Sequence, residues 1–111
     1  MLIRLEELRA VLKESGLPVF RDKATNNTPY PYIVYSFVSK KQKFASGKVL
    51  ASMINYQISI YSNGTEQDIK LLDSPLKKNQ IPYTAFMGVS GDENDETITN
   101  YFTYVDVLED E

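Results

Sequence analysis

The chain has 111 residues, of which 42% are apolar and 24% are charged, with five glycines and five prolines. This composition is typical of a globular protein and not of a disordered one, and the length predicts a single domain over residues 1–111, because two separate cores would each bury too little apolar surface. The chain contains neither cysteine nor histidine, which excludes a disulfide scaffold, a thiolate nucleophile and the commonest general base.

Charge is unevenly distributed along the sequence. All 12 lysines and arginines lie within residues 1–91 together with 7 acids, whereas residues 92–111 hold 8 acids and no base. The net charge of −3 therefore combines a basic body of +5 with an acidic end of −8. Such a chain can attract copies of itself head to tail, and its acidic end repels polyanions.

Apolar residues at helical spacing predict an amphipathic first helix over residues 2–15, closed by Gly16 and Pro18. Charged residues interrupt this segment before it could form a signal peptide or a membrane span, so no membrane partner is expected. Residues 17–24 suit a short strand or an extended arm, and the prolines within residues 26–32 predict a loop.

Alternation with a period of two predicts two long strands, one over residues 32–39 and one over residues 49–61. The second, with the sequence VLASMINYQISIY, has the clearest alternation in the chain. The two strands are expected to form a hairpin around a lysine-rich turn at residues 40–48.

A second helix is predicted after the Asn-Gly turn. Thr65 is the expected N-cap, with Asp68 completing a capping box, and the buried face consists of Ile69, Leu72 and Leu76. Pro75 is expected to kink or split this helix, because it lacks an N–H and its ring clashes one turn back.

Two final strands are predicted within residues 83–91 and 97–108, joined by an acidic turn. The predicted fold is therefore α+β: a mostly antiparallel sheet of four to five strands with two main helices packed on it, in the order α-(β)-β-β-α-β-β.

Eight tyrosines raise the possibility of a small single-stranded nucleic-acid-binding domain, because aromatic rings beside lysines can stack on bases. Tyr35, Tyr56 and Tyr104, however, occupy strand positions expected to face the core, and the acidic end would weaken phosphate binding. The other candidates suit a protein interface instead: Tyr30, Tyr32, Tyr61 and Tyr101. Nucleic acid is therefore the alternative partner, not the expected one.

The acidic turn contains Asp92, Glu93, Asp95 and Glu96. It resembles a calcium loop only in its density of acids, because Thr97 stands where an EF-hand requires glycine. No acidic pair falls inside an apolar strand, where burial could raise a carboxyl pKa. We therefore expect no metal, no cofactor and no enzymatic activity.

The lysine-rich turn contains Lys40, Lys41, Lys43, Phe44 and Lys48. An exposed hairpin turn explains the lysines but not the apolar ring of Phe44. A charged loop with one aromatic anchor is typical of a docking arm, in which charge steers the approach and the ring is buried on contact.

Several strings carry a resemblance over residues 3–108: PYPYIVYSF, ASGKVL, NYQISIYSNGTEQDIKLLDSPLKKNQIPY and YFTYVDVL. Together they are similar to the tail-completion or tail-terminator proteins of long-tailed phages and prophages of Gram-positive bacteria. The resemblance implies a structural protein whose copies form a ring, commonly a hexamer, that caps the tail tube and docks to the head connector. Another phage neck or minor capsid protein is the nearest alternative.

By the same resemblance, the lysine-rich hairpin would dock on an adjacent subunit or on the tail tube protein. The protein would reside in the virion, at the tail or neck, and in the bacterial cytoplasm during assembly. The charges add a hypothesis of their own: the lysines of one copy approach the acidic turn of the next and orient it, while apolar contacts supply the affinity.

Overall fold

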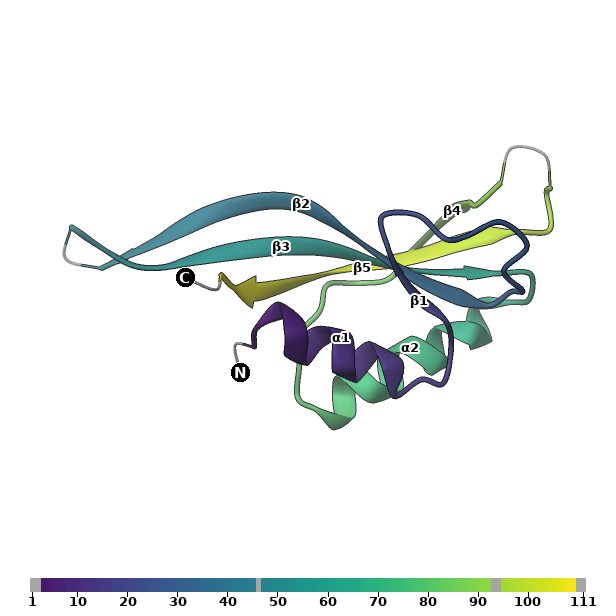
Figure 1. The fold of residues 1–111 in the computed structure, drawn as a ribbon, viewed down its shortest axis with the longest axis horizontal. Helices are drawn as coiled ribbons and strands as arrows, with labels where there is room; N and C mark the ends of the chain where they lie inside the picture. The colour runs from purple at the N-terminus through teal and green to yellow at the C-terminus, as the bar shows by residue number, and fades with distance from the viewer. Residues whose placement is uncertain (1–2, 46, 93–94, 110–111) are drawn as a thin grey trace.

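The computed structural model describes residues 3–45, 47–92 and 95–109. Within these ranges the elements are α1 (Leu5–Lys13), β1 (Val19–Arg21), β2 (Tyr32–Ala45), β3 (Lys48–Ser62), the 3-10 turn η1 (Glu66–Asp68), α2 (Ile69–Lys78), β4 (Met87–Ser90) and β5 (Thr99–Leu108) (Figure 1). The predicted α+β class and the predicted order of elements are confirmed.

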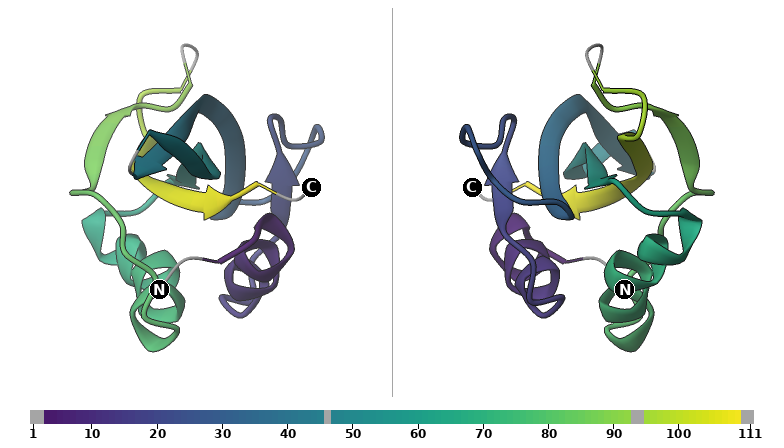
Figure 2. Two further views of the ribbon diagram at one scale, coloured as in Figure 1. Left: turned by 90° about the vertical axis from the view of Figure 1, so that its left-hand side faces the viewer. Right: turned by 90° about the vertical axis from the view of Figure 1, so that its right-hand side faces the viewer.

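The strands form one sheet in the order β1-β2-β3-β5-β4. The short strand β1 runs parallel to β2, whereas all the other neighbouring pairs are antiparallel. Both helices lie on the same side of this sheet, as the two end views show (Figure 2). The central strand β3 is therefore flanked by the two longest partners and covered by helices on one face.

Buried side chains fill the space between the helices and the sheet. The helices contribute Leu8, Val11, Leu12, Leu72 and Leu76, and the sheet contributes Ile33, Tyr35, Tyr56, Ile58, Ile60, Val105 and Val107. The inward positions predicted for Tyr35 and Tyr56 are confirmed, since each is only 3% exposed. Burying an aliphatic or aromatic side chain of this size stabilises a fold by about 1.5–3 kcal/mol.

The prediction that Tyr104 of β5 faces the core is wrong, because the neighbouring residue faces it instead. Val105 belongs to the core, so its neighbour Tyr104 lies on the opposite face, where its ring centroid is 5.9 Å from that of Phe102. Tyr101, expected to serve an interface, packs against the core instead, with Gly88 directly across on β4. A side chain at Gly88 would crowd this ring, because an added Cβ would lie 3.2 Å from it.

The start of the second helix differs in detail from the prediction. Thr65 does cap it, accepting a hydrogen bond from the Gln67 N–H at 3.3 Å, but the first turn is the 3-10 turn η1. The carboxylate of Asp68 does not complete a capping box; it accepts a hydrogen bond from the hydroxyl of Ser62. Ser62 is fully buried at the end of β3, where its hydroxyl requires a partner.

Of the two outcomes predicted for Pro75, a split does not occur, because α2 runs without interruption from Ile69 to Lys78. The residue is buried, so its ring contributes apolar contact that offsets the missing N–H. The carbonyl oxygen of Pro75 accepts hydrogen bonds from the Asn79 N–H at 3.1 Å and the Asn79 side chain at 2.8 Å. These hydrogen bonds complete the last turn of α2, on the C-terminal side of Pro75.

The β2–β3 hairpin is longer than predicted, because residues 40–45 and 48 belong to its strands and not to a loop. The strands pair as far as Ala45 and Lys48, and the turn between them contains Gly47 with φ of +76°. Glycine adopts this left-handed conformation without steric cost. Lysines do not prevent strand pairing where both faces of the hairpin meet solvent, so charge alone was a poor indicator of a loop.

Candidate functional site

The hairpin projects beyond the rest of the sheet as a two-stranded ribbon, which we call the arm (Figure 1). β5 pairs with β3 only from Met53 onward, where Met53 faces Leu108. The arm therefore comprises residues 42–45 and 48–52. Three of the predicted docking residues lie on it, namely Lys43, Phe44 and Lys48, whereas Lys40 and Lys41 stand at its root.

The lysines at the root of the arm pair with acids of the same chain. The Lys40 ammonium lies 2.6 Å from the Glu109 carboxylate, and that of Lys41 lies 3.5 Å from the carboxylate of Asp106. Asp106 also accepts a hydrogen bond from the Asn55 side chain at 2.9 Å. These pairs are partly exposed, so each stabilises the fold by at most about 1 kcal/mol. They tie the end of β5 to the base of the arm.

Sequence reasoning missed both acidic partners. Asp106 lies within an apolar strand pattern and Glu109 just beyond it, and neither is close to the lysines along the chain. The uneven distribution of charge was the available signal, because it placed acids near the C-terminal end and lysines before residue 49. Only the register of β3 with its two neighbours shows which of them meet.

Lys48 lies near the tip of the arm and is exposed. Among the residues that the structure describes, no acid forms an ion pair with it. The side chains of Lys43 and Phe44 lie outside the described part of the structure, so their predicted docking role stays a prediction. Their backbones belong to β2, paired with Ala51 and Val49.

Strand edges along the arm have no neighbouring strand within the described ranges. β1 pairs with β2 only at Ile33–Tyr35, so the outer edge of β2 is open from Ser36 to Ala45. The outer edge of β3 is open in the same way over residues 48–51, because the Ser52 carbonyl accepts a hydrogen bond from the Glu109 N–H at 3.0 Å. Open edges present backbone N–H and C=O groups that can pair with a strand of another chain.

The acidic turn lies at the other end of the sheet. Thr99, at the start of β5, pairs with Ser62 at the end of β3, whereas the arm contains the start of β3. Glu93 lies outside the described residues, and Glu96 is exposed. One chain therefore does not bring its lysine-rich arm and its acidic turn together.

Asp95 organises the described part of this turn. Its carboxylate accepts hydrogen bonds from the Thr97 hydroxyl at 2.6 Å and the Thr97 N–H at 2.9 Å. These bonds favour the charged form and lower the pKa of Asp95 below its ordinary value. Asp95 therefore keeps its negative charge at a lower pH than an ordinary aspartate does.

Three tyrosines stack where β2 begins and β3 ends. The ring centroid of Tyr32 lies 5.3 Å from that of Tyr30 and 5.2 Å from that of Tyr61. Phe20 meets the edge of Tyr32 at 6.1 Å. We call Tyr30, Tyr32 and Tyr61 the tyrosine stack. All three are half-buried, so these candidates for an interface are gathered at one place.

We predict that Tyr32 and Tyr61 titrate late. Burial first, and the neighbouring tyrosines after it, raise the pKa of Tyr32 and Tyr61 above the ordinary 10.0. The folded state thus favours the neutral form of both tyrosines. This preference stabilises the fold below pH 10, and the stabilisation is lost as the pH rises through the raised pKa values. Tyrosinate absorbance measured against pH should show a late component that shrinks in Tyr61→Phe; an unchanged curve would contradict the assignment.

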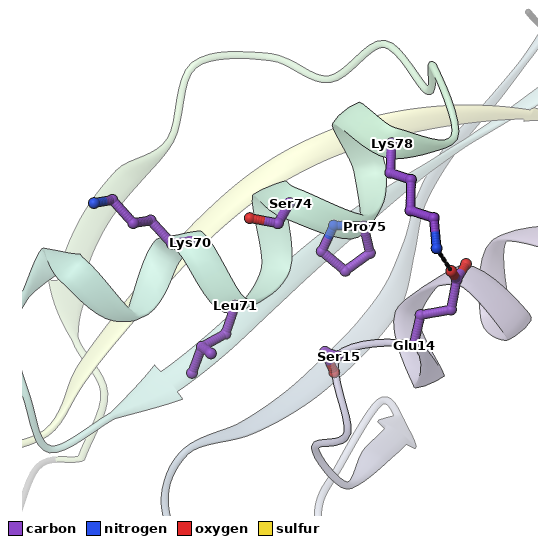
Figure 3. A pocket seen from close by; sticks show the side chains of 7 residues that line it. All are labelled: Glu14, Ser15, Lys70, Leu71, Ser74, Pro75 and Lys78. Carbon is purple, nitrogen blue, oxygen red and sulfur yellow. Dashed lines mark hydrogen bonds and ion pairs between the residues drawn. The ribbon is translucent and has the colours of Figure 1, made fainter.

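A hollow of about 420 Å³ lies between α1 and α2 (Figure 3). The carboxylate of Glu14 reaches across it, 3.4 Å from the Lys78 ammonium and 2.9 Å from the amide nitrogen of Asn79. Leu71 and Pro75 supply apolar surface. Lys78 and Asn79 both engage the carboxylate of Glu14, so these residues join the end of α1 to the end of α2.

Neither helix is long and apolar enough to cross a membrane, within the part of the chain that the structure describes. In the same ranges, no three Asp, Glu, His or Cys side chains gather as a metal site would require. No protein-family model matches the chain, and no curated protein matches it.

Proposed function

We propose that the chain is a structural subunit whose copies assemble head to tail into a ring that caps a phage tail tube and docks on the head connector. The observation that carries the proposal is the arm, which projects from one end of the sheet, away from the acidic turn at the other end (Figure 1). The 14 residues of β2 alone span roughly 43 Å. Complementary surfaces this far apart on one chain can meet only between copies.

Head-to-tail contact determines the kind of assembly. The surface that donates the arm differs from the surface that receives it, so the interface is heterologous, and such interfaces give closed rings or open filaments. A closed ring agrees with the resemblance to tail-completion proteins. The step from a self-assembling subunit to the head–tail joint of a virion rests on that resemblance, carried by strings such as PYPYIVYSF and NYQISIYSN.

Exposed apolar side chains supply a source of affinity. Phe37 and Val38, on β2 beyond the end of β1, are 54% and 46% exposed. Met87 and Val89, on the edge strand β4, are 51% and 50% exposed. Apolar groups at the centre of an interface contribute affinity, whereas exposed charges mainly guide the encounter. The charges of the arm therefore orient the subunits, and these apolar pairs hold them.

Charge reversal at the arm tests this mechanism. We expect the triple variant Lys40→Glu, Lys41→Glu, Lys43→Glu to associate at least about tenfold more slowly at low ionic strength, with the difference shrinking as salt is added, because screening removes the steering term. Light scattering would follow self-association, and electron microscopy would count tails joined to heads. Unchanged joining by the triple variant would refute the proposal.

A matched control separates contacts within the chain from contacts between chains. The triple variant also breaks the ion pairs of Lys40 and Lys41, and adding Asp106→Lys and Glu109→Lys restores those pairs with reversed signs. If the slow association came only from the broken ion pairs at the root of the arm, the variant with all five substitutions would associate at the normal rate. We expect its association to remain slow, because the reversed charges of the arm still meet the acidic turn of the next copy.

A further inference from the structure

A cavity of about 440 Å³ lies beside the tyrosine stack, under the loop that joins β1 to β2. Its wall contains the three stacked rings and, from the loop and the acidic turn, Asp22, Lys23 and Asp92. The side-chain nitrogen of Asn100 donates a hydrogen bond to the Tyr61 hydroxyl at 3.5 Å. The cavity is therefore a formed hollow with one aromatic wall and charged groups at its rim.

The chemistry of this wall favours a cation. Tyr32 stacks between Tyr30 and Tyr61, so its ring faces are covered, and the tyrosine hydroxyl oxygens are the groups that can accept hydrogen bonds from an ammonium or guanidinium group. Asp22 and Asp92 add two carboxylates against the single ammonium of Lys23. Phosphate or carboxylate ligands would meet both carboxylates, so an anionic ligand fits poorly. A long side chain with a terminal positive charge fits best, with its stem against the rings and its charge near the carboxylates.

The arm of the same chain does not reach this cavity. Tyr32 and Tyr61 pair with each other at the end of the hairpin farthest from the turn. The whole length of β2 separates them from the tip. Any arm lysine that enters the cavity must therefore come from a second copy.

We propose that the cavity receives a lysine side chain from the arm tip of the neighbouring copy, and that Lys48 is this lysine. Lys40 and Lys41 are engaged at the root of the arm, whereas Lys48 is exposed and forms no ion pair with a described acid. This inference rests on the head-to-tail assembly proposed above. The inference adds the site that receives the arm, which the sequence did not indicate. Asp92 of the acidic turn belongs to that site.

Cysteine pairing tests the position of the arm. The chain has no cysteine, so each one introduced is unique. We expect an equimolar mixture of Ala45→Cys and Asn26→Cys chains to form a mixed disulfide dimer under mild oxidation, because Ala45 pairs with Lys48 across the hairpin and Asn26 lies on the rim of the cavity. The matched control replaces Asn26→Cys with Ser74→Cys, in the hollow between the helices, and should give at least several-fold less.

The charge is tested separately by sedimentation. Lys48→Gln and Asp92→Asn should each weaken self-association about tenfold, and Lys48→Arg should retain it because arginine keeps the charge. Absence of the mixed disulfide, or unchanged association of Lys48→Gln, overturns the inference. Association without the disulfide would leave the proposed assembly standing and remove only this receiving site, whereas a chain that neither associates nor cross-links would remove both.

Discussion

Deleting residues 43–51 and joining Gln42 to Ser52 through an Asn-Gly turn should give a folded chain that no longer associates with itself. Gln42 and Ser52 face each other across the hairpin, so a two-residue turn can close the shortened strands. The deletion removes Lys48, Lys43, Phe44 and the open strand edges nearest the tip of the arm together. Because the proposed contact needs all of these, sedimentation velocity should show monomer at every concentration at which the full chain associates.

The same variant should keep its stability. All core side chains that the structure describes lie outside the deletion, and the ion pairs of Lys40 and Lys41 at the root of the arm are retained. We expect the thermal unfolding midpoint to stay within a few degrees of the full chain, which separates loss of contact from loss of fold. Association of the shortened chain at full strength would show that the arm is not the docking element.

Ile58→Ala should destabilise the fold more than any surface substitution. Ile58 is fully buried in the middle of the central strand, directly across from Tyr35 on one side and Thr103 on the other. Removing its buried methyl and methylene groups leaves a cavity that the packed sheet cannot fill, at a cost of about 2–5 kcal/mol. The unfolding midpoint should fall by roughly 8–20 °C, which denaturant and thermal titrations would measure.

Phe37→Ala is the matched control for this substitution. Phe37 lies on the neighbouring strand but is 54% exposed, so the larger side chain should cost less stability than Ile58 does. Its loss should appear instead as weaker self-association, because its ring is part of the exposed apolar surface proposed for the interface. A greater loss of stability from Phe37→Ala than from Ile58→Ala would contradict the assignment of core and surface.

Periodicity was a sound guide wherever one face of an element is buried and the other is not. The amphipathic spacing in α1 and the alternation around Tyr56 in β3 both predicted the buried face correctly. The same reasoning failed for Tyr104, because apolar and aromatic residues occupy both faces of β5. It also failed at Lys40–Gln42, where consecutive side chains are exposed on both faces of the strand and therefore produce no pattern.

The candidate site was predicted only in part. The lysines and the acidic turn were found from charge, and the arm that carries the lysines does project from the sheet (Figure 1). The partners of Lys40 and Lys41 could not be found, because Glu109 and Asp106 come together with them only through the pairing of three strands. The tyrosine stack depends in the same way on the register that places Tyr32 opposite Tyr61.

Local chemistry along the chain, namely residue spacing, capping groups and turn residues, determined which segments form helices and strands and the α+β class they build, since these depend on near neighbours. The tertiary structure alone decided how far the arm projects, which acids meet its lysines and where the cavity lies. The reason is physical: those features arise from strand register and from contacts between residues up to a hundred positions apart, and composition and periodicity carry no record of either.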